Sequence, residues 1–289
     1  MKNFIFIGDY CEDKRVYGTC DRLNPEAPVP ILSVRHQDKV EAGMCGNVCN
    51  NLNAIANAAN EAGMLDTEHE AHLFLNKPET PELKVRYIDT ASGYILLRTD
   101  IKASEQLTFD GWCVDRFNGV LNEDSVVIIS DYDKGYLSKL QISYIAKRCY
   151  DMGVFCFLDT KKPIGQFCNE HLTFIKINDK EYSDSKKLEP ATVSGMTNVI
   201  VTRGNEGSEL VGTTLVSTEA IEVRDVCGAG DAFLAALAYF TVYTDLSIVE
   251  ILTLCNRVSG EVCKSHKSAI TELDAYRVFK DFVSSNSVS

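Results

Sequence analysis

The sequence predicts an α/β protein of three layers, in which helices cover both faces of a mostly parallel sheet. From about residue 105 onward, short continuous apolar runs alternate with longer segments of helical periodicity. This alternation is typical of buried parallel strands joined by helices. Several of the runs are followed by a polar cluster, at residues 131–135, 159–162, 178–181 and 202–207. Because the carboxyl ends of parallel strands meet at one edge of a sheet, we expect these clusters to form one ligand site.

Composition and charge narrow the classes of partner. The 289 residues are 45% hydrophobic and 24% charged, and we expect one domain spanning residues 1–289. The net charge of −12 argues against nucleic acid or an anionic membrane as the main partner. No apolar run reaches the roughly 20 residues of a membrane span, and the N-terminal apolar run is too short for a signal segment. A cytoplasmic location is therefore expected.

The eleven cysteines are scattered along the chain and odd in number, which is typical of reduced thiols in a cytosolic protein. Cys45 and Cys49 could share one face of a helix. No second pair of Cys or His residues with zinc spacing accompanies them. Buried thiols are therefore favoured over a zinc site.

The first hundred residues predict strands, one helix and connections. Phe4 to Ile7 is expected to be a short strand that ends at Gly8 and Asp9. The proline-rich residues 16–34 are expected to be extended chain, either an edge strand or a loop crossing and not a central strand. A glycine-containing turn at 43–47 precedes a helix over 48–62. The polar residues 63–82 predict a connection, and 83–88 with 94–99 predict a hairpin.

The remaining elements follow the alternating pattern. Helices are predicted from about 105 to 121, over 138–152 and from 232, and strands over 125–130, 154–158, 172–177 and 198–201. A further β-like run, 220–226, leads into the stretch Asp225-Val-Cys-Gly-Ala-Gly-Asp231. There, small residues allow a sharp turn whose amides would bind an anion at a helix N-terminus. Asp231 could be a general base or a helix cap, and the local sequence leaves both open.

These residues resemble the ribokinase-like (pfkB) sugar kinase family over nearly the whole chain. The stretch from Asp225 to Asp231 is similar to the family signature Asp-Thr-Thr-Gly-Ala-Gly-Asp, and Asn178-Asp-Lys-Glu181 to its Asn-x-x-Glu motif. Gly8-Asp9 with Asp13, the run Arg22-Leu-Asn-Pro-Glu-Ala-Pro-Val-Pro30 and residues 130–135 look like the branch of D-glycero-β-D-manno-heptose 7-phosphate kinases. The resemblance implies a ribokinase-like core with a small β lid from about 14–34 and 83–100.

The resemblance also implies roles for individual residues. Asp231 would be the general base, with an anion hole formed by Gly228, Ala229 and Gly230 and with Lys161 near the transferred phosphate. Mg²⁺ would be held by Asn178 and Glu181. ATP would be bound by Asn178, Thr202, Gly204 and Gly207, with Asn256 beside the adenine. The sugar would be bound by Asp9, Asp13, Gly43 and Asn47.

The implied activity is phosphoryl transfer from ATP to a sugar phosphate, most specifically to the anomeric hydroxyl of heptose 7-phosphate. The implied enzyme is a homodimer that uses Mg²⁺, with a monovalent cation as a further candidate ion. Three departures from the family pattern bear on the sugar: Met44 in the turn before the helix, Cys227 in place of Thr, and a short segment between 57 and 83 in which a strand and a helix are expected to be missing. No His-x-Gly-His motif occurs, so an adenylyltransferase half is expected to be absent. Another sugar kinase of the family and a catalytically weak sugar- or nucleotide-binding protein are the alternatives.

Overall fold

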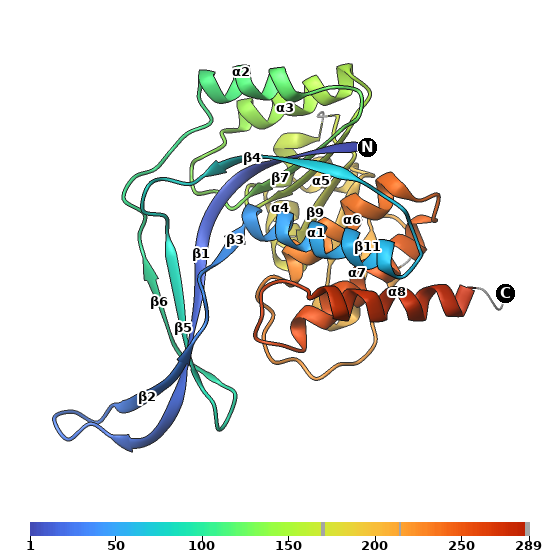
Figure 1. Ribbon diagram of the computed structural model, residues 1–289. Coiled ribbons are helices and arrows are strands. Elements are labelled where there is room, and N and C mark those ends of the chain that lie inside the picture. The colour runs from blue at the N-terminus through green and yellow to red at the C-terminus, as the bar shows by residue number, and fades with distance from the viewer. Residues whose placement is uncertain (169–170, 214, 287–289) are drawn as a thin grey trace.

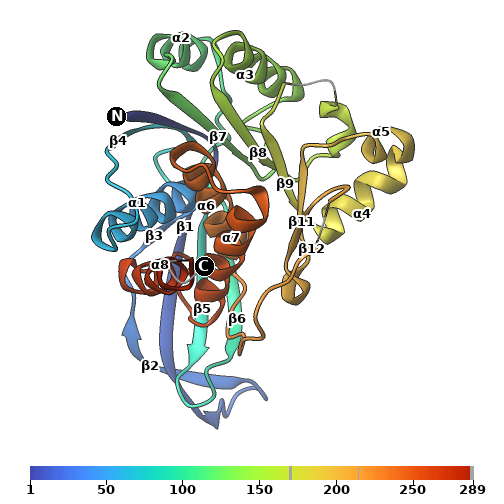
Figure 2. The ribbon, with the colours of Figure 1, turned by 90° about the vertical axis from the view of Figure 1, so that its right-hand side faces the viewer.

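The structure is a computed structural model that describes residues 1–289 except 169–170, 214 and 287–289. Its core is one sheet with helices on both faces (Figures 1 and 2). Six parallel strands lie side by side in the order β4, β1, β7, β8, β9 and β10, and two antiparallel strands, β11 and β12, continue the sheet. Their bounds are β1 Lys2–Leu23, β4 His69–Asn76, β7 Ser125–Asp131, β8 Phe155–Thr160, β9 Phe174–Asn178, β10 Val199–Thr202, β11 Ser208–Leu210 and β12 Leu215–Val216.

The side chains of the central strands alternate between two hydrophobic clusters, which is why helices cover both faces of the sheet. Phe4 and Phe6 join one cluster, whereas Ile5 and Ile7 join the other. The first cluster contains α1 Cys45–Glu61, α6 Ala229–Tyr243, α7 Ile248–Cys263 and α8 Glu272–Asn286. The second contains α2 Gly111–Val120, α3 Lys139–Asp151, α4 Asp179–Leu188 and α5 Pro190–Ser194. The predicted three-layer α/β fold is confirmed.

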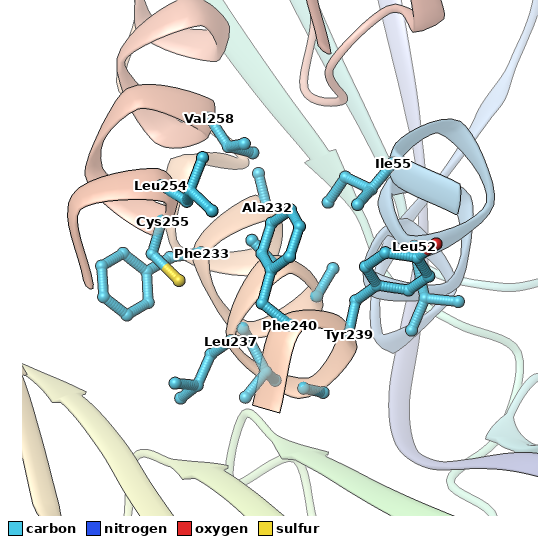
Figure 3. Packing of buried hydrophobic residues seen from close by; sticks show 14 of the residues in the cluster. Leu52, Ile55, Ala232, Phe233, Leu237, Tyr239, Phe240, Leu254, Cys255 and Val258 are labelled. Carbon is cyan, nitrogen blue, oxygen red and sulfur yellow. The ribbon is translucent and has the colours of Figure 1, made fainter. Parts of the chain in front are cut away.

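The most deeply buried helix is α6, in which every residue from Asp231 to Phe240 is buried. Figure 3 shows Leu237, Tyr239 and Phe240 of α6 between residues of α1, such as Leu52, and residues of α7, such as Leu254. Such a helix is apolar all round because it has no face left for water. Packing on all sides fixes the position of its N-terminus, where Asp231 lies.

A second sheet leaves the core along β1, which is one strand of 22 residues. Beyond Tyr10, β1 pairs with β2 Pro30–Gln37, β3 Glu41–Met44 and β5 Leu83–Asp89, and β5 pairs with β6 Ile95–Ile101. We call these strands, with the part of β1 beyond Tyr10, the outer sheet; Figure 1 shows it extending away from the helices. The prediction that the first strand ends at Asp9 was therefore wrong. β1 continues through the polar residues because it pairs with neighbouring strands on both sides.

Three other sequence predictions require correction. The segment 63–82 contains β4, which pairs with β1, so it is not only a polar connection; the expectation that a strand and a helix of the family are missing there stays a prediction. The helix predicted from residue 105 begins at Gly111, where Asp110 caps it. The β-like run Ala220–Val226 forms no strand: in the described chain it pairs with no strand, and the N–H groups of Arg224 and Asp225 donate instead to the carbonyl oxygen of Cys263 at the end of α7.

The other predicted elements are confirmed with shifts of a few residues at their ends, except that residues 16–18 of β1 pair with β2 on one side and β5 on the other and therefore do not lie at a sheet edge. The hairpin of β5 and β6 turns at residues 90–94, and α3 and α7 each begin with a capping box, at Ser138 and Ser247 respectively. In the described part of the chain, no helix has the length and apolar character needed to cross a membrane.

Candidate active site

The candidate site lies where the core strands end and α6 begins. Gly228 starts α6 in the left-handed conformation, with φ of 82°. A Cβ atom on Gly228 would lie only 1.8 Å from the carbonyl oxygen of Ser268, so this turn requires glycine. The following amides of Ala229 and Gly230 lie in the first turn of a 15-residue helix. The end of the helix that attracts anions therefore faces the strand edge.

Asp231 is a buried carboxylate in this first helical turn, with 5% of its surface exposed. Its Oδ2 accepts a hydrogen bond of 2.8 Å from Asn47 Nδ2, and its Oδ1 accepts one of 2.8 Å from the Tyr132 hydroxyl. Burial raises the pKa of Asp231 to about 6, although these two hydrogen bonds and the charge of Lys176 act to lower it. A carboxylate with a pKa near neutrality is suited to accept a proton from a hydroxyl.

Lys176 brings a positive charge beneath the glycine turn. It lies within β9, is 5% exposed, and its Nζ forms an ion pair of 2.8 Å with Asp159 at the end of β8. A Cβ atom on Gly230 would lie 2.9 Å from Nζ, so the ammonium group lies against the turn. Sequence reasoning missed this residue. The sequence did indicate it, because Lys176 is a single charged residue in the otherwise apolar run from Phe174 to Ile177.

Asn47, on the first turn of α1, links the carboxylate to the C-terminal part of the chain. Its Nδ2 donates to the carbonyl oxygen of Ser268 at 2.7 Å as well as to Asp231. Arg15 of the outer sheet donates to the Ser268 hydroxyl at 3.0 Å. Among the described residues, Asn47 Oδ1 is buried without a hydrogen-bond partner. An unpaired buried acceptor costs about 1–3 kcal/mol, which a donor from a bound ligand would offset.

Asp9 is buried where β1 leaves the core sheet. Its Oδ2 accepts from the backbone N–H groups of Tyr132 at 2.8 Å and Lys134 at 3.2 Å, and its Oδ1 accepts from Asn76 at 3.3 Å. Burial raises the pKa of Asp9, while these hydrogen bonds oppose the rise. Asp9 therefore ties the loop after β7 to the start of the outer sheet.

Asp13 and Gly43 lie together on paired strands of the outer sheet. A Cβ atom on Gly43 would lie 2.4 Å from Asp13 Oδ2, so the two residues are in direct contact. Asp13 is buried and forms an ion pair with Arg86 of β5. Arg86 also donates to Cys227 Sγ at 2.9 Å. Burial raises the pKa of Cys227 to about 11, so this residue is a neutral thiol near pH 7.

Met44 adopts a conformation that glycine adopts more easily. Its φ of 53° and ψ of −130° cost about 1–3 kcal/mol for a residue with a side chain. The family pattern has glycine at this position, and the side chain of Met44 is buried. Cys45 and Cys49 follow it on α1 within the hydrophobic cluster, where burial raises the pKa of both thiols.

A cavity of about 430 Å³ opens beside α6 and α7. Of the predicted nucleotide residues, all but Asn178 line it together with Gly230: Thr202, Gly204, Gly207 and Asn256. Asn256 donates to the carbonyl oxygen of Val216 at 2.9 Å. The volume is that of a small-molecule site, and Gly230 connects the cavity to the turn that carries Asp231.

The remaining predicted residues cluster at the end of β9. Asn178 caps α4 in a capping box with Glu181, and Lys161 forms an ion pair with Glu181. Partial burial lowers the pKa of Lys161, but the carboxylates of Asp159 and Glu181 outweigh it and raise the pKa overall. In the described chain, no group of three or more His, Cys, Asp or Glu residues could hold a metal ion. The Asn178 Oδ1 and both Glu181 carboxylate oxygens already have partners in the capping box and the Lys161 ion pair, so they fit a Mg²⁺ ion that is bound by phosphates and contacts them through its water ligands.

Comparisons with known proteins relate the chain to carbohydrate kinases. Residues 145–275 match the model of the pfkB family of carbohydrate kinases. The chain is 30% identical to a protein of a Nitratiruptor species named bifunctional protein HldE, over 93% of this chain and 63% of that relative. A protein of the same name from Caulobacter vibrioides is 29% identical over 90% of this chain and 60% of its own length. The chain thus spans less than two thirds of these curated relatives.

Solved structures share the fold. Phosphofructokinase-2 from Escherichia coli in complex with substrates and products superposes with a TM-score of 0.69 at 12% identity, covering 98% of this chain and 99% of that one. Ribokinase from Arabidopsis thaliana in complex with ribose and ATP gives a TM-score of 0.61 at 15% identity, covering 97% and 99%. At these identities the likeness establishes the fold alone.

Proposed function

The chain contains a domain of the pfkB family of carbohydrate kinases, and on this premise we propose that it transfers the γ-phosphoryl group of ATP to a sugar hydroxyl. One observation carries the proposal: the buried carboxylate of Asp231 lies in the first turn of α6, beside a glycine turn and the ammonium group of Lys176. A carboxylate would repel phosphate at an anion site unless it accepted a proton there. This pairing of a base with an anion site supports phosphoryl transfer.

In the proposed mechanism, the sugar hydroxyl oxygen attacks the γ-phosphorus while its proton passes to Asp231. The bond from the γ-phosphorus to the bridging oxygen breaks in line, and ADP leaves. The amides of Gly228 and Gly230 and the cations of Lys176 and Lys161 would stabilise the phosphoryl oxygens; the Ala229 amide, which donates to the Val226 carbonyl oxygen at 3.3 Å, would join them by releasing that contact. Asn178 and Glu181 would hold Mg²⁺, which shields the phosphate charge.

The sugar would lie on the other side of Asp231, between α1 and the outer sheet. Asp9 and Asp13 offer carboxylates there, and Asn47 offers the unpaired Oδ1. We propose that the outer sheet covers the sugar as a lid over residues 14–34 and 83–100. The name of the HldE relatives and the sequence motifs favour heptose 7-phosphate, phosphorylated at its anomeric hydroxyl.

Two further features are proposed on the same premise. A monovalent cation would bind beside Asp225, whose Oδ2 is buried without a partner in the described chain. A homodimer would form through the outer sheet, because β6 exposes apolar side chains such as Ile95 and Leu97. Catalysis itself needs neither feature in this mechanism.

The test is ADP release by purified protein with ATP, Mg²⁺ and a panel of sugars and sugar phosphates. We expect release with at least one sugar phosphate and a fall of about 10²–10⁴-fold for Asp231→Asn, the range for loss of a general base. Asp245→Asn is the matched control, because Asp245 lies in an exposed loop at the other end of α6. Circular dichroism would check that both variants are folded.

The outcomes separate the alternatives. Turnover of another sugar alone would identify a different kinase of the family. Tight sugar binding without ADP release across the whole panel would indicate a binding protein, and the strained Met44 turn would then be the first place to look for the cause. Full turnover by Asp231→Asn would refute the assigned base.

A further inference from the structure

Tyr132 contacts three groups of the candidate site from the loop that follows β7. Its backbone N–H donates to Asp9 Oδ2 at 2.8 Å, and its hydroxyl donates to Asp231 Oδ1 at 2.8 Å. Lys161 Nζ lies 5.3 Å from the centroid of its ring. Asp9 and Asp231 come from elements far apart in the sequence, and Tyr132 bonds to both.

We propose that Tyr132 is a positioning residue that holds the Asp231 carboxylate for proton transfer, opposite Asn47, and fixes it to the loop bound by Asp9. The inference rests on the proposed kinase function and adds to it a second support for the base. Asn47 donates to Asp231 Oδ2 and the Tyr132 hydroxyl donates to Asp231 Oδ1, so rotation of the carboxylate would break two hydrogen bonds. Because each carboxylate oxygen can accept more than one hydrogen bond, the sugar hydroxyl can still approach Asp231.

The hydroxyl of Tyr132 acts as a donor here because it remains neutral. Burial, with the charge of Asp231 next, raises the pKa of Tyr132 well above its ordinary value. A neutral phenol that donates to a carboxylate stabilises the ionised form, so this contact lowers the pKa of Asp231 against the effect of burial. The base therefore stays ionised at lower pH than burial alone would allow.

Other charged groups face Asp231, and they are the same in a variant that lacks only the hydroxyl. Asp159 raises the pKa of Asp231 and Lys176 lowers it. Lys161 lies close enough to interact with the carboxylate, as do the thiols of Cys45 and Cys227, which burial keeps neutral near pH 7. A change of titration in such a variant would therefore report the lost hydrogen bond.

The test compares Tyr132→Phe with the wild-type protein by two measurements. The first is the titration of the Asp231 carboxyl carbon by NMR in protein labelled with ¹³C-aspartate, assigned with Asp231→Asn; it requires no turnover. The second is the pH profile of kcat/KM with ATP, Mg²⁺ and the accepted sugar. Tyr136→Phe is the matched control, because Tyr136 lies in the same segment and its hydroxyl contacts Cys113 rather than the site.

We expect the wild-type carboxyl to titrate near pH 6 and the midpoint in Tyr132→Phe to rise by roughly one pH unit, the scale of one hydrogen bond to a charged group. The acid limb of kcat/KM should move to higher pH with it, giving about a fivefold loss at pH 6, about a tenfold loss at pH 5 and almost none at pH 9. Tyr136→Phe should match the wild type in both measurements.

An unchanged NMR midpoint in Tyr132→Phe would overturn the proposal, and so would a loss of kcat/KM that is equal at all pH values. A shifted midpoint in a protein that releases no ADP with any sugar would support the contact and refute the kinase function instead.

Discussion

Gly230→Ala should separate folding from catalysis at the glycine turn. Gly230 lies in the first turn of α6 and is not among the residues with positive φ. Alanine is therefore compatible with its backbone, and in a helix it stabilises by about 0.5–1 kcal/mol relative to glycine. The new Cβ atom would lie 2.9 Å from Lys176 Nζ, which is closer than real Cβ contacts and would push the ammonium group away.

The effect on turnover follows from the position of that ammonium group. Nζ is held by Asp159 at 2.8 Å and lies against the turn where the phosphoryl group is proposed to pass. Loss of one such electrostatic contact costs about 2.7–4 kcal/mol in the transition state, or about 10²–10³-fold in kcat. The free energy of unfolding should meanwhile change by less than about 1 kcal/mol, because the clash is with the far end of a flexible side chain.

ADP release and urea unfolding would measure both effects, and two other glycines provide controls. Gly119→Ala, with no atom within 4 Å of the new Cβ, should leave activity unchanged and show the same helix gain of about 0.5–1 kcal/mol in unfolding. Gly228→Ala should unfold the protein more easily, because its Cβ would lie 1.8 Å from a backbone oxygen at a φ of 82°. If Gly230→Ala retained activity within about threefold, or lost activity only in step with stability, the proposed anion site would be refuted.

Three further predictions concern charge and assembly. Since burial raises the pKa of Asp231 from 3.8 to about 6, the stability of the wild-type protein falls as pH rises through that interval. Asp231→Asn should therefore raise the free energy of unfolding in urea by about 1–3 kcal/mol at pH 8 and leave it unchanged at pH 3.5. An equal rise at both pH values would contradict this reasoning. Lys176→Met should lose both stability and turnover, because it leaves the buried carboxylate of Asp159 without its ion-pair partner. The double variant Lys176→Met with Asp159→Asn should regain stability but not turnover, since no unpaired buried charge remains. By light scattering, the protein should have about twice the 32.1 kDa chain mass, and Leu97→Asp should reduce it to one chain; a monomeric wild type would rule out the dimer.

Much of the fold could be read from local patterns. The apolar runs that became β7, β8, β9 and β10 were recognisable because strands buried on both faces are apolar throughout. Gly228 and Asp231 stood out because small residues precede an apolar helical segment there, although the local sequence left a helix cap as open as a general base. The nucleotide residues were expected from the family motif, and the structure places Thr202, Gly204, Gly207 and Asn256 around one cavity.

What the sequence by itself determined was the alternation of strands and helices from β7 to β10 and the helix start at α6, whereas a ligand site at one edge of the sheet and a base at Asp231 stay predictions. Only the tertiary structure decided that β1 continues through both sheets, that Lys176 lies beneath Gly230, and that Tyr132 reaches Asp231 from 99 residues away. Burial and turn preferences can be recognised in the sequence because they produce regular patterns among neighbouring residues. Contacts between distant residues produce no such pattern, because they depend on how whole elements pack against one another.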